Sequence, residues 1–287
     1  MADTQIQDRN FKRVWFITGA SRGLGALMAR AALQDGNAVV ATGRDAAAVA
    51  ARLGPAPGLL PLALDVTDAR QAEQAARQAL QAFGRIDVLV NNAGFGLLGA
   101  VEESEEEAVR RVFETNVFGV LNVLRAVLPA MRAQGAGHVI NLSSIGGWRA
   151  AAGFGVYCAT KFAIEGITEA LHQELAPLGI HATVVEPGYF RTDFLDGASL
   201  AVASRIIEDY AATAGAVRAA AGALNHRQPG DPEKLALAML QLADAPRPPL
   251  RLPLGSDTLQ AIAEKQAHVA WETEAWQDLA RSTDFAR

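Results

Sequence analysis

A tyrosine and a lysine, Tyr157 and Lys161, stand four residues apart in the stretch GVYCATKFAIEG. Residues at this spacing lie on one face of a helix, so a phenol and an ammonium group would be neighbours. A phenol in such a pair can exchange a proton with a substrate. The same pair also occurs on exposed helix surfaces, so the stretch alone leaves a reactive pair and a surface pair as alternatives.

Three glycines, Gly19, Gly23 and Gly25, follow an apolar run in VWFITGASRGLG and open a helical pattern. A dinucleotide pyrophosphate needs a tight turn, a close approach of the backbone and a helix N-terminus directed at its charge, and glycine suits each need. The segment Gly19–Gly23 also matches the Gly-x-Ser-x-Gly nucleophile elbow of serine hydrolases. Because only 13 residues precede the first strand, whereas the elbow normally follows several strands, the position counts against a hydrolase.

Short apolar runs alternate with longer amphipathic runs before Pro187. The apolar runs predict strands covered on both faces, at Val14–Thr18, Ala38–Thr42, Leu60–Leu64, Val88–Asn91, His138–Leu142 and Ala182–Glu186. The amphipathic runs predict helices at Leu24–Gln34, Ala46–Leu53, Asp68–Phe83, Glu105–Gln134 and Val156–Leu175. This alternation predicts an α/β fold, with a parallel sheet and helices on both of its faces.

After Pro187 the pattern is less regular, and no residue types there indicate chemistry. Residues 196–222 are Ala-rich and predict helix, residues 231–246 predict a helix with an Asp at its N-cap, residues 249–255 an edge strand and residues 256–280 a terminal helix. We therefore predict a polar N-terminal tail over residues 1–12 and a single domain over residues 13–287. Within it, residues 193–287 are expected to form a substrate-specific lid and C-terminal helices.

The acidic run EESEEE, residues 102–107, admits a metal-binding or partner-binding interpretation. However, Ser104 and Glu107 have the spacing of a capping box, and carboxylates favour the positive N-terminus of the helix that follows. We therefore interpret the run as the start of a helix.

The composition argues against several classes of protein. The formal net charge is −5 and there is no basic run, which argues against a nucleic-acid partner. No apolar run reaches about 18 residues, so no membrane span is predicted. The polar start lacks the apolar stretch of a signal peptide and the single cysteine, Cys158, fits a reducing compartment, so we expect a cytoplasmic protein. The five histidines are scattered without helical ligand spacing, so no metal site is predicted.

Seven short motifs stand in order along the chain. They are TGASRGLG (18–25), LDVTD (64–68), NNAG (91–94), ETNVFG (114–119), NLSS (141–144), YCATK (157–161) and EPGYFRT (186–192). As a set they resemble the classical short-chain dehydrogenase/reductase family, over roughly residues 12 to 192. The resemblance implies a Rossmann-type doubly wound parallel sheet of about seven strands, a nicotinamide cofactor and hydride transfer to or from a carbon–oxygen bond.

The resemblance assigns four residues to catalysis. Tyr157 is the acid/base that exchanges a proton with the substrate oxygen, and Lys161 favours its phenolate form and binds the nicotinamide ribose hydroxyls. Ser144, which stands 13 residues before the tyrosine as the family's serine does, is expected to bind the substrate oxygen, and Ser143 to be structural. Asn116 is expected to hold a water that links Lys161 to solvent; a solvated side chain in mid-helix is the alternative.

The remaining motifs imply contacts with the cofactor. The implied residues are Gly19, Ser21, Arg22, Gly23, Leu24 and Gly25 in the glycine loop, Asp65 and Val66 at the adenine, Asn92, Ala93 and Gly94 at the adenosine ribose, and Pro187, Gly188, Phe190 and Thr192 at the nicotinamide carboxamide. Thr192 is also a candidate helix N-cap.

The end of the second strand, VVATGRD, predicts NADP(H) as the cofactor. An NAD-selective enzyme usually has an acidic residue there, which accepts from the ribose hydroxyls, whereas this chain has Gly43. Arg44 follows and Arg22 lies in the glycine loop, so two guanidinium groups would flank a 2′-phosphate. We interpret Asp45 as the cap of the next helix. A solvent-facing Arg44 is the alternative.

Aromatic residues expected near the cleft predict a bulky or hydrophobic carbonyl or alcohol substrate. They are Phe95, Trp148, Phe154, Tyr189 and Phe194, each of which would also suit a core position. A non-catalytic NADP(H)-binding regulator is a further alternative, against which the complete catalytic set argues. By resemblance we also expect a homodimer or homotetramer, assembled through the long helices at residues 105–134 and 156–175.

Overall fold

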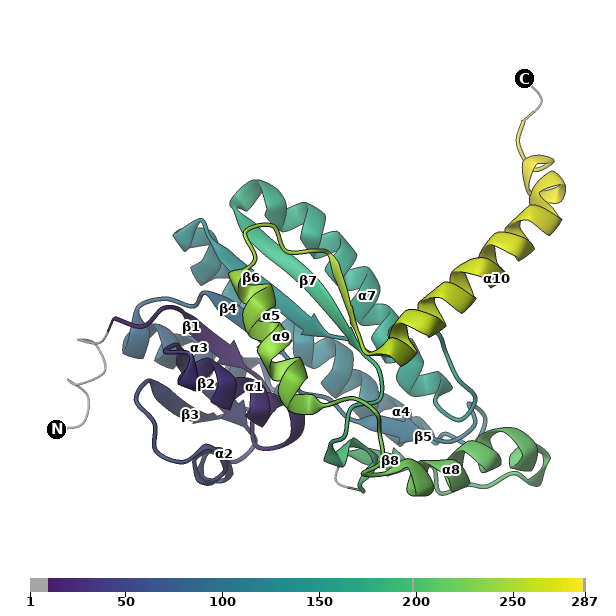
Figure 1. Cartoon of the computed structure of the whole chain (residues 1–287), viewed down its shortest axis with the longest axis horizontal. Helices are drawn as coiled ribbons and strands as arrows, with labels where there is room; N and C mark the ends of the chain where they lie inside the picture. Colours follow the sequence, from purple (N-terminus) through teal and green to yellow (C-terminus); the bar gives the residue numbers. More distant parts are fainter. Residues whose placement is uncertain (1–9, 198, 286–287) are drawn as a thin grey trace.

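The computed structural model describes residues 10–197 and 199–285, so residues 1–9 of the predicted tail lie outside the described part. Its centre is a sheet of seven parallel strands in the order β3-β2-β1-β4-β6-β7-β9 (Figure 1). The strands are β1 (Val14–Ile17), β2 (Ala38–Gly43), β3 (Leu59–Ala63), β4 (Val88–Asn91), β6 (Gly137–Leu142), β7 (Ile180–Pro187) and β9 (Arg251–Leu254). This confirms the predicted Rossmann-type parallel sheet and the edge strand near residue 250.

Helices cover both faces of the sheet. The α-helices are α1 (Gly23–Gln34), α2 (Ala46–Leu53), α3 (Ala69–Phe83), α4 (Glu106–Phe113), α5 (Gly119–Gln134), α6 (Ile145–Trp148), α7 (Gly155–Leu175), α8 (Ala216–Leu224), α9 (Pro232–Asp244) and α10 (Ser256–Arg281). Two predicted caps are confirmed: Asp45 accepts from the N–H of Ala47 at the start of α2, and Asp231 accepts from the N–H of Glu233 in α9.

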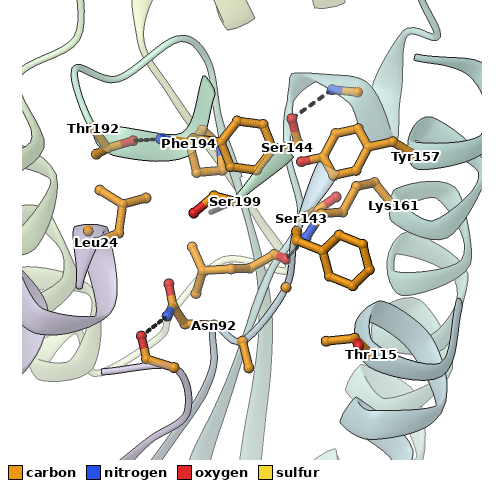
Figure 2. A pocket seen from close by; sticks show the side chains of 18 of the residues that line it. Leu24, Asn92, Thr115, Ser143, Ser144, Tyr157, Lys161, Thr192, Phe194 and Ser199 are labelled. Carbon is orange, nitrogen blue, oxygen red and sulfur yellow. Dashed lines mark hydrogen bonds between the residues drawn. The ribbon is translucent and has the colours of Figure 1, made fainter. Parts of the chain in front are cut away.

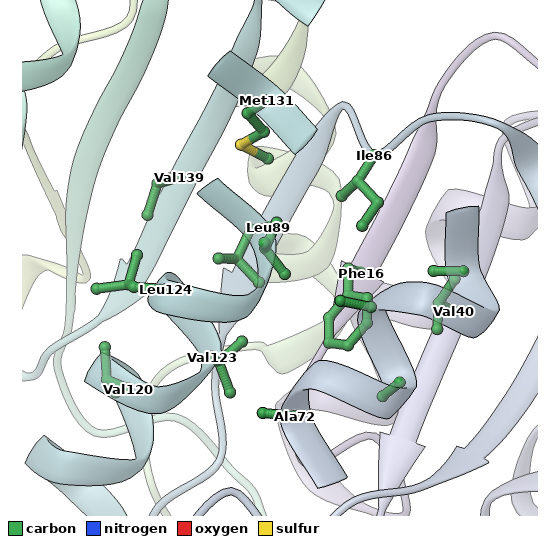
Figure 3. Packing of buried hydrophobic residues seen from close by; sticks show 14 of the residues in the cluster. Phe16, Val40, Ala72, Ile86, Leu89, Val120, Val123, Leu124, Met131 and Val139 are labelled. Atoms are coloured by element: carbon green, nitrogen blue, oxygen red, sulfur yellow. The ribbon is translucent and has the colours of Figure 1, made fainter. Parts of the chain in front are cut away.

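Two hydrophobic layers hold the helices on the sheet, because successive residues of a strand point to opposite faces. Phe16 of β1 faces the layer formed with α3, α5 and α7, where it lies with Leu89 and Val123 (Figure 3). Its neighbours Trp15 and Ile17 face the layer formed with α1 and α9. Since both faces are buried, the strands are apolar almost throughout.

The domain begins before residue 13. Phe11, at the end of the predicted tail, packs edge-to-face on Phe83 of α3, with ring centroids 6.0 Å apart. The N–H of Lys12 also donates to the carbonyl oxygen of Gly36 at 3.2 Å. These contacts make residues 11 and 12 part of the packed structure.

The helix predicted over residues 105–134 contains a π-helical turn. Helix α4 passes into the π turn Glu114–Phe118 before α5 begins at Gly119. Such a turn changes where the following side chains point and is frequent at functional sites. The helical run Glu106–Gln134 is long and apolar enough to span a membrane, judged by length and composition alone, although polar residues interrupt it. Its residues Val120, Val123 and Val127 pack against the sheet, as in a core helix.

The capping box predicted for Ser104 and Glu107 is wrong. Helix α4 has Glu105 as its N-cap, with no side-chain cap hydrogen bond. The hydroxyl of Ser104 donates instead to the carbonyl oxygen of Ala100 at 3.0 Å, because residues 101–104 form a turn before the helix starts.

The carboxylates of the acidic run hold a distant segment, residues 204–218, and we call Glu102, Glu103 and Glu105 the acidic latch. Glu103 is 1% exposed; it accepts from the N–H of Ile207 at 2.9 Å and from the guanidinium of Arg218 at 2.5 Å. The carboxylate of Glu105 accepts from the backbone N–H groups of residues 204 and 205, each at 3.0 Å. The tyrosine hydroxyl of residue 210 donates to Glu102 at 2.8 Å.

The residues predicted as a lid occupy three different places (Figure 1). Residues 193–197 and 199–224, including β8 (Leu200–Val202) and α8, lie beside β5 (Gly96–Leu98), with which β8 pairs in parallel. Helix α9 packs on α1, and β9 completes the sheet beside β7. Helix α10 leaves the body of the molecule and points away from it.

Candidate active site

A pocket of about 990 Å³ lies at the carboxyl ends of the parallel strands. Residues that follow β1, β2, β3, β4, β6 and β7 all contribute to its lining. Strand β1 lies between β2 and β4, so the order of the strands reverses at this point of the sheet. Doubly wound sheets bind their ligands in the crevice at such a reversal.

Most residues assigned to the cofactor or substrate from the sequence line this pocket. They are Gly19, Ser21, Arg22, Gly23, Leu24, Arg44, Asp65, Val66, Asn92, Ala93, Gly94, Phe95, Ser144, Phe154, Tyr157, Lys161, Pro187, Gly188, Tyr189, Phe190, Thr192 and Phe194. Gly25, Asn116 and Trp148 are not among the lining residues.

Two glycines allow the glycine loop to pack closely on its surroundings. Gly19 has φ +68°, and a Cβ atom there would lie 2.9 Å from the Cα of Ala93. A Cβ atom on Gly25 would overlap the carbonyl oxygen of Gly19. Gly25 therefore acts from behind the pocket, by letting α1 approach the loop.

The N-terminus of α1 faces the pocket without a side-chain cap. Arg22 is the N-cap residue and makes no side-chain cap hydrogen bond, and the first turn of the helix has no acidic residue. Gly23 and Leu24, at the start of α1, line the pocket. Amide N–H groups at such a helix end bind anions, so this donor set fits the pyrophosphate of a dinucleotide.

The NNAG motif is hydrogen-bonded to the glycine loop. The Thr18 hydroxyl oxygen accepts from the N–H groups of Asn92 at 2.9 Å and Ala93 at 3.0 Å. The Asn92 side-chain amide donates to the carbonyl oxygens of Thr18 at 2.8 Å and Gly19 at 3.1 Å. Asn92 thus supports the glycine loop besides lining the pocket.

The end of β2 leaves little room for a side chain at Gly43. A Cβ atom there would lie 2.9 Å from a methyl group of Val49 and 3.5 Å from the Cβ of Ser21. The next residue, Arg44, is exposed and lines the pocket, whereas Asp45 is engaged as the cap of α2. A glycine therefore stands where an NAD-selective site has its acid, and an arginine follows it.

The carboxylate of Asp65, which the sequence assigns to the adenine, already has partners within the protein. Oδ1 of Asp65 accepts from the N–H of Thr67 at 3.0 Å and from its hydroxyl at 2.8 Å. Asp65 and Val66 both line the pocket. The Thr67 bonds fix the direction of the carboxylate before any ligand binds.

Ser144, Tyr157 and Lys161 meet on one side of the pocket (Figure 2). Ser144 is the N-cap of α6: its Oγ accepts from the N–H of Gly146 at 3.0 Å, and its hydroxyl also hydrogen-bonds the Tyr157 side chain. Lys161 lies one turn beyond Tyr157 on α7 and donates to the carbonyl oxygen of Leu142 at 2.8 Å. The pair is therefore buried at the pocket, which excludes the surface pair, and its reactivity stays a prediction.

Burial dominates the ionisation of this pair. It raises the pKa of Tyr157, and the hydrogen bond with Ser144 opposes the increase. It lowers the pKa of Lys161 to about 8, while the negative charge of Glu165 acts in the opposite direction. We expected Lys161 to favour the phenolate, whereas desolvation acts in the opposite direction and is the largest influence on the pKa of Tyr157, so burial favours the neutral phenol.

The two neighbouring serines face different partners. Ser144 lies at Tyr157, whereas the Ser143 hydroxyl lies toward the carboxylate of Glu165, whose pKa it lowers. A Cβ atom on Gly147 would overlap the Ser143 hydroxyl, so this glycine makes room for it. This placement agrees with a structural role for Ser143.

Asn116 is 2% exposed in the π turn, which excludes the solvated alternative. Its Oδ1 accepts from the N–H of Phe95 at 3.0 Å, and its Nδ2 donates to the carbonyl oxygen of Phe95 at 2.9 Å and to the Thr160 hydroxyl at 3.1 Å. Asn116 therefore connects the loop after β4 to α7. Its role at a water beside Lys161 stays a prediction.

Aromatic rings border Tyr157 in the pocket. The ring centroids of Phe154 and Phe194 lie 6.1 Å and 5.7 Å from that of Tyr157. Trp148 does not belong to this group, because its indole ring stacks on the guanidinium of Arg251, 5.0 Å from the ring centroid. Several further residues line the pocket but belong to no motif, so they could not be predicted from the sequence: Arg149, Ala151, Leu195, Ser199 and Gln228.

Two candidate residues have simpler structural roles. Thr192 caps the short 3-10 helix Asp193–Leu195, its Oγ1 accepting from the N–H of Phe194 at 3.3 Å, and it also lines the pocket. Cys158 is buried, and burial raises the pKa of its thiol. A thiol with a raised pKa is a poor nucleophile, so Cys158 is a packing residue.

Asp193, Asp196 and His226 each offer a ligand atom, and these atoms lie within 4.8 Å of one another. Two of the residues are exposed, and the side-chain amide of Asn225 already donates to Asp196. Exposed acidic groups of this kind are common without an ion, so the cluster alone does not indicate a metal site.

Sequence comparisons agree with this architecture. The family model described as short chain dehydrogenase matches residues 13–202. The oxidoreductase BOA17 of Botryotinia fuckeliana is 38% identical over 269 residues, which cover 93% of this chain and 97% of the relative. A 3-ketodihydrosphingosine reductase of Bacteroides thetaiotaomicron is 37% identical over 244 residues, covering 85% of this chain and 88% of the relative.

Solved structures show the same fold. A short-chain dehydrogenase from Streptomyces avermitilis is 38% identical, with a TM-score of 0.87, covering 96% of this chain and 100% of its own. Two more distant structures contain a dinucleotide: a Brucella melitensis 3-ketoacyl-(acyl-carrier-protein) reductase with NADH (28% identity, TM-score 0.70) and a metagenomic short-chain oxidoreductase with NADP (27% identity, TM-score 0.66). In both cases the match covers 85% of this chain and 97% of the other.

Proposed function

Because the chain belongs to the short-chain dehydrogenase/reductase family, we propose that it is an NADP(H)-dependent oxidoreductase that interconverts a carbonyl and an alcohol. One observation carries the proposal: the Ser144 and Tyr157 hydroxyls lie together in the same pocket as the uncapped N-terminus of α1. A single pocket thus combines a proton donor with a site for a pyrophosphate. The alternatives of a serine hydrolase and of a non-catalytic regulator have no comparable observation in their favour.

Tyr157 supplies the proton in the reduction direction. When bound, the nicotinamide dinucleotide provides the hydride for the carbonyl carbon. The Ser144 hydroxyl binds the carbonyl oxygen, and the neutral phenol of Tyr157 gives its proton to that oxygen as negative charge develops there. In the oxidation direction, Tyr157 takes the proton back as a phenolate, which the Lys161 ammonium and an oxidised, positive nicotinamide stabilise.

Lys161 has a second task at the cofactor. Its Nζ atom is held by the carbonyl oxygen of Leu142, so two of its three ammonium hydrogens are available for the nicotinamide ribose hydroxyls. Pro187 and Gly188, which line the pocket at the end of β7, are the residues we assign to the carboxamide. On this assignment, Lys161 of α7 and the end of β7 would hold the nicotinamide end of the cofactor.

A preference for NADP(H) over NAD(H) follows from Gly43 and Arg44. No carboxylate is present at the end of β2 to accept from the ribose hydroxyls, and the Arg44 guanidinium lines the pocket there. Guanidinium groups bind phosphate oxygens through two hydrogen bonds at once, so Arg44, with Arg22 from the glycine loop, suits a 2′-phosphate.

The substrate we propose is a bulky or hydrophobic ketone or aldehyde. Phe154 and Phe194 border Tyr157, and Leu195 and Tyr189 also line the pocket, so an apolar group beside the reacting carbonyl would be desolvated. The relative named 3-ketodihydrosphingosine reductase supports a ketone by its name.

A panel of carbonyl compounds tests this function. Short polar aldehydes and sugars would be compared with bulky aryl and alkyl ketones, with NADPH as reductant and its absorbance loss as the readout. We expect turnover with members of the bulky group, and faster turnover with NADPH than with NADH. Binding of NADPH without turnover of any member would favour the regulator instead.

For assembly we propose a homodimer or homotetramer in the cytoplasm, formed through the helices at residues 105–134 and 156–175. Phe118 and Phe162, which are 48% and 40% exposed, lie on these helices and would be covered in such a contact. Light scattering measures the number of subunits in the assemblies of the wild type and of Phe118→Glu. A monomeric wild type would contradict the assembly.

A further inference from the structure

Arg251, on the edge strand β9, contacts four side chains from three other parts of the chain. Its Nη1 donates to Glu165 and, at 2.8 Å, to Glu186, and its Nη2 donates to Glu169. The guanidinium carbon also lies 5.0 Å from the ring centroid of Trp148. We call Arg251 and these four partners the Arg251 cluster.

The cluster is largely shielded from water. The side chains of Glu165 and Glu186 are 7% and 1% exposed, and that of Arg251 is 25% exposed; Glu169, at 50%, forms the outer edge. Exposed ion pairs contribute little to the stability of a folded protein, whereas removing the cation from a buried carboxylate destabilises the fold strongly. The two buried carboxylates therefore share the same guanidinium as their ion-pair partner.

Three partners of Arg251 belong to segments that carry part of the candidate active site. Glu165 lies one helical turn after Lys161 on α7. Glu186 directly precedes Pro187 and Gly188 at the pocket end of β7. Trp148 ends α6, the short helix that Ser144 caps.

We propose that Arg251 is a positioning residue for the reaction: its guanidinium fixes the Lys161 turn of α7, the end of β7 and the Ser144 helix relative to one another. Arg251 is not among the residues that line the pocket, so it acts through these three segments and not on the substrate. This inference rests on the proposed function, because the three segments matter together only if hydride and proton transfer occur between them.

Arginine is the side chain that this arrangement requires. Its planar fork donates several hydrogen bonds in fixed directions and stacks on an indole at the same time. A lysine ammonium is a point charge on a flexible stem, so it would not reach three carboxylates and cover Trp148 together. Arg251→Lys therefore keeps the charge and removes the geometry.

The cluster also makes the positioning sensitive to pH. Burial raises the pKa of Glu165 to about 7, the negative charge of Glu186 adds to this, and Ser143 and Arg251 oppose it. The charged groups around Glu165 are Arg251 on β9, Glu186 on β7, and Lys161 and Glu169 on α7. Above that pKa the ionised Glu165 holds Arg251 and favours the Lys161 ammonium; below it both attractions weaken.

The test compares Arg251→Gln, Arg251→Lys and Glu165→Gln with a control, Arg13→Gln. Arg13 forms an ion pair with Asp244 and lies at the start of β1, at the end of the sheet opposite the pocket. The measurements are melting temperature, the NADPH dissociation constant from the fluorescence of bound NADPH, and kcat and KM for carbonyl reduction between about pH 6 and 9, the range around an ionisation near 7.

For Arg251→Gln we expect kcat to fall by about tenfold to a hundredfold, since small misplacements of reacting groups have effects of this size. Arg251→Lys should recover only part of the loss, and Arg13→Gln should keep kcat within about twofold, as expected for an exposed ion pair. In Glu165→Gln the ionisation of kcat near pH 7 should disappear. Wild-type kcat in Arg251→Gln, or full recovery in Arg251→Lys, would overturn the proposal.

Two further readouts keep the test decisive. If Arg251→Gln does not fold, Arg251→Lys and Glu165→Gln, which leave fewer unpaired buried charges, provide the comparison. If the wild type binds NADPH but reduces no carbonyl, the proposed function fails by itself. The positioning of Pro187 and Gly188 by Arg251 is then still tested by the NADPH dissociation constant. This constant should rise in Arg251→Gln and stay unchanged in Arg13→Gln. An unchanged constant in both variants would overturn the proposed positioning role.

Discussion

The Nζ atom of Lys161 lies 5.8 Å from the ring centroid of Tyr157, while it donates to the carbonyl oxygen of Leu142 at 2.8 Å. The ammonium is thus fixed by β6 and not by the phenol. At this distance it acts on Tyr157 by its charge, and it keeps donors for another ligand. The burial that raises the pKa of Tyr157 is the stronger influence on the phenol.

Tyr157→Phe tests the proton donor. The change deletes the hydroxyl and keeps the ring that packs against Phe154 and Phe194, so fold and NADPH binding should be retained. General acid–base catalysis contributes roughly 10²–10⁴-fold, so kcat for carbonyl reduction should fall by that factor or more. Activity within about threefold of wild type would contradict the assignment, since loss of the general acid costs far more.

Ser144→Ala and Ser143→Ala form a matched pair of neighbouring hydroxyl deletions. Ser144→Ala removes the group that hydrogen-bonds Tyr157 and should lower kcat, whereas Ser143→Ala should change it much less. Since Ser144 also caps α6, its loss should lower the stability by about 1 kcal/mol, which a melting curve measures separately. The opposite order of kcat values would mean that Ser143 binds the substrate oxygen.

Arg44→Ala should reduce the preference for NADPH over NADH. Charge-assisted hydrogen bonds contribute roughly 1.5–3 kcal/mol each, so the wild-type ratio of kcat/KM values should be about tenfold to a hundredfold or more. The loss should appear mainly in the KM for NADPH. A wild type that prefers NADH, or an unchanged ratio in Arg44→Ala, would contradict the prediction.

Gly43→Asp should reverse the preference, because a carboxylate repels a 2′-phosphate and accepts from the free ribose hydroxyls. Any side chain at this position crowds a methyl group of Val49. Gly43→Ala is therefore the control: it introduces the same crowding without charge and should weaken both cofactors alike. A reversal in Gly43→Ala would show that crowding, and not charge, selects the cofactor.

Glu103→Gln should release the segment at residues 204–218. Hydrogen bonds from Ile207, Ala100 and Arg218 lower the pKa of Glu103, so the ionised carboxylate is the form that holds the segment. Its stabilising effect is complete above the unfolded-state pKa and is lost as the pH falls toward the folded-state value. At pH 7 we expect tryptic cleavage at Arg205 to be about tenfold faster in the variant. Glu106→Gln, an exposed glutamate of α4, should leave the cleavage rate unchanged.

Ending the chain at Gln266 tests the part of the predicted lid that lies in α10. Residues of the predicted lid that line the pocket fall between Asp193 and Gln228, and α10 points away from it. We expect kcat and KM of the shortened chain to stay within about twofold of the full chain, as for changes remote from an active site. A large loss of kcat would show that α10 contributes to the site. Light scattering of both chains would show whether α10 also contributes to assembly.

The strands and most helices could be predicted because their periodicity reflects local burial. The glycine loop and the Tyr157–Lys161 pair could be placed for the same reason, since short-range spacing fixes both. The π turn could not be predicted, because residues 105–134 form a continuous helical pattern in sequence and the interruption lies in the backbone of Glu114–Phe118.

Contacts between residues far apart in the sequence could not be predicted from local sequence patterns. The acidic latch resembles a helix start in sequence, and its partners stand about a hundred residues further along the chain. Trp148 looks like a pocket residue until Arg251, 103 positions later, is seen to lie against its ring. In both cases the deciding partner belongs to the region after Pro187, where the sequence shows no motif.

The outward course of α10 determines what the intrinsic fluorescence of this protein reports. Of the four tryptophans, Trp271 and Trp276 lie on α10 and are 64% and 66% exposed, whereas Trp15 is 1% exposed and Trp148 is covered by Arg251. Emission should therefore combine a long-wavelength component, which acrylamide quenches, with a shorter-wavelength component that resists it. A dinucleotide titration followed by total emission would be dominated by a helix remote from the pocket, whereas the acrylamide-resistant component would report Trp15 in the core and Trp148, which belongs to the segment that begins at Ser144.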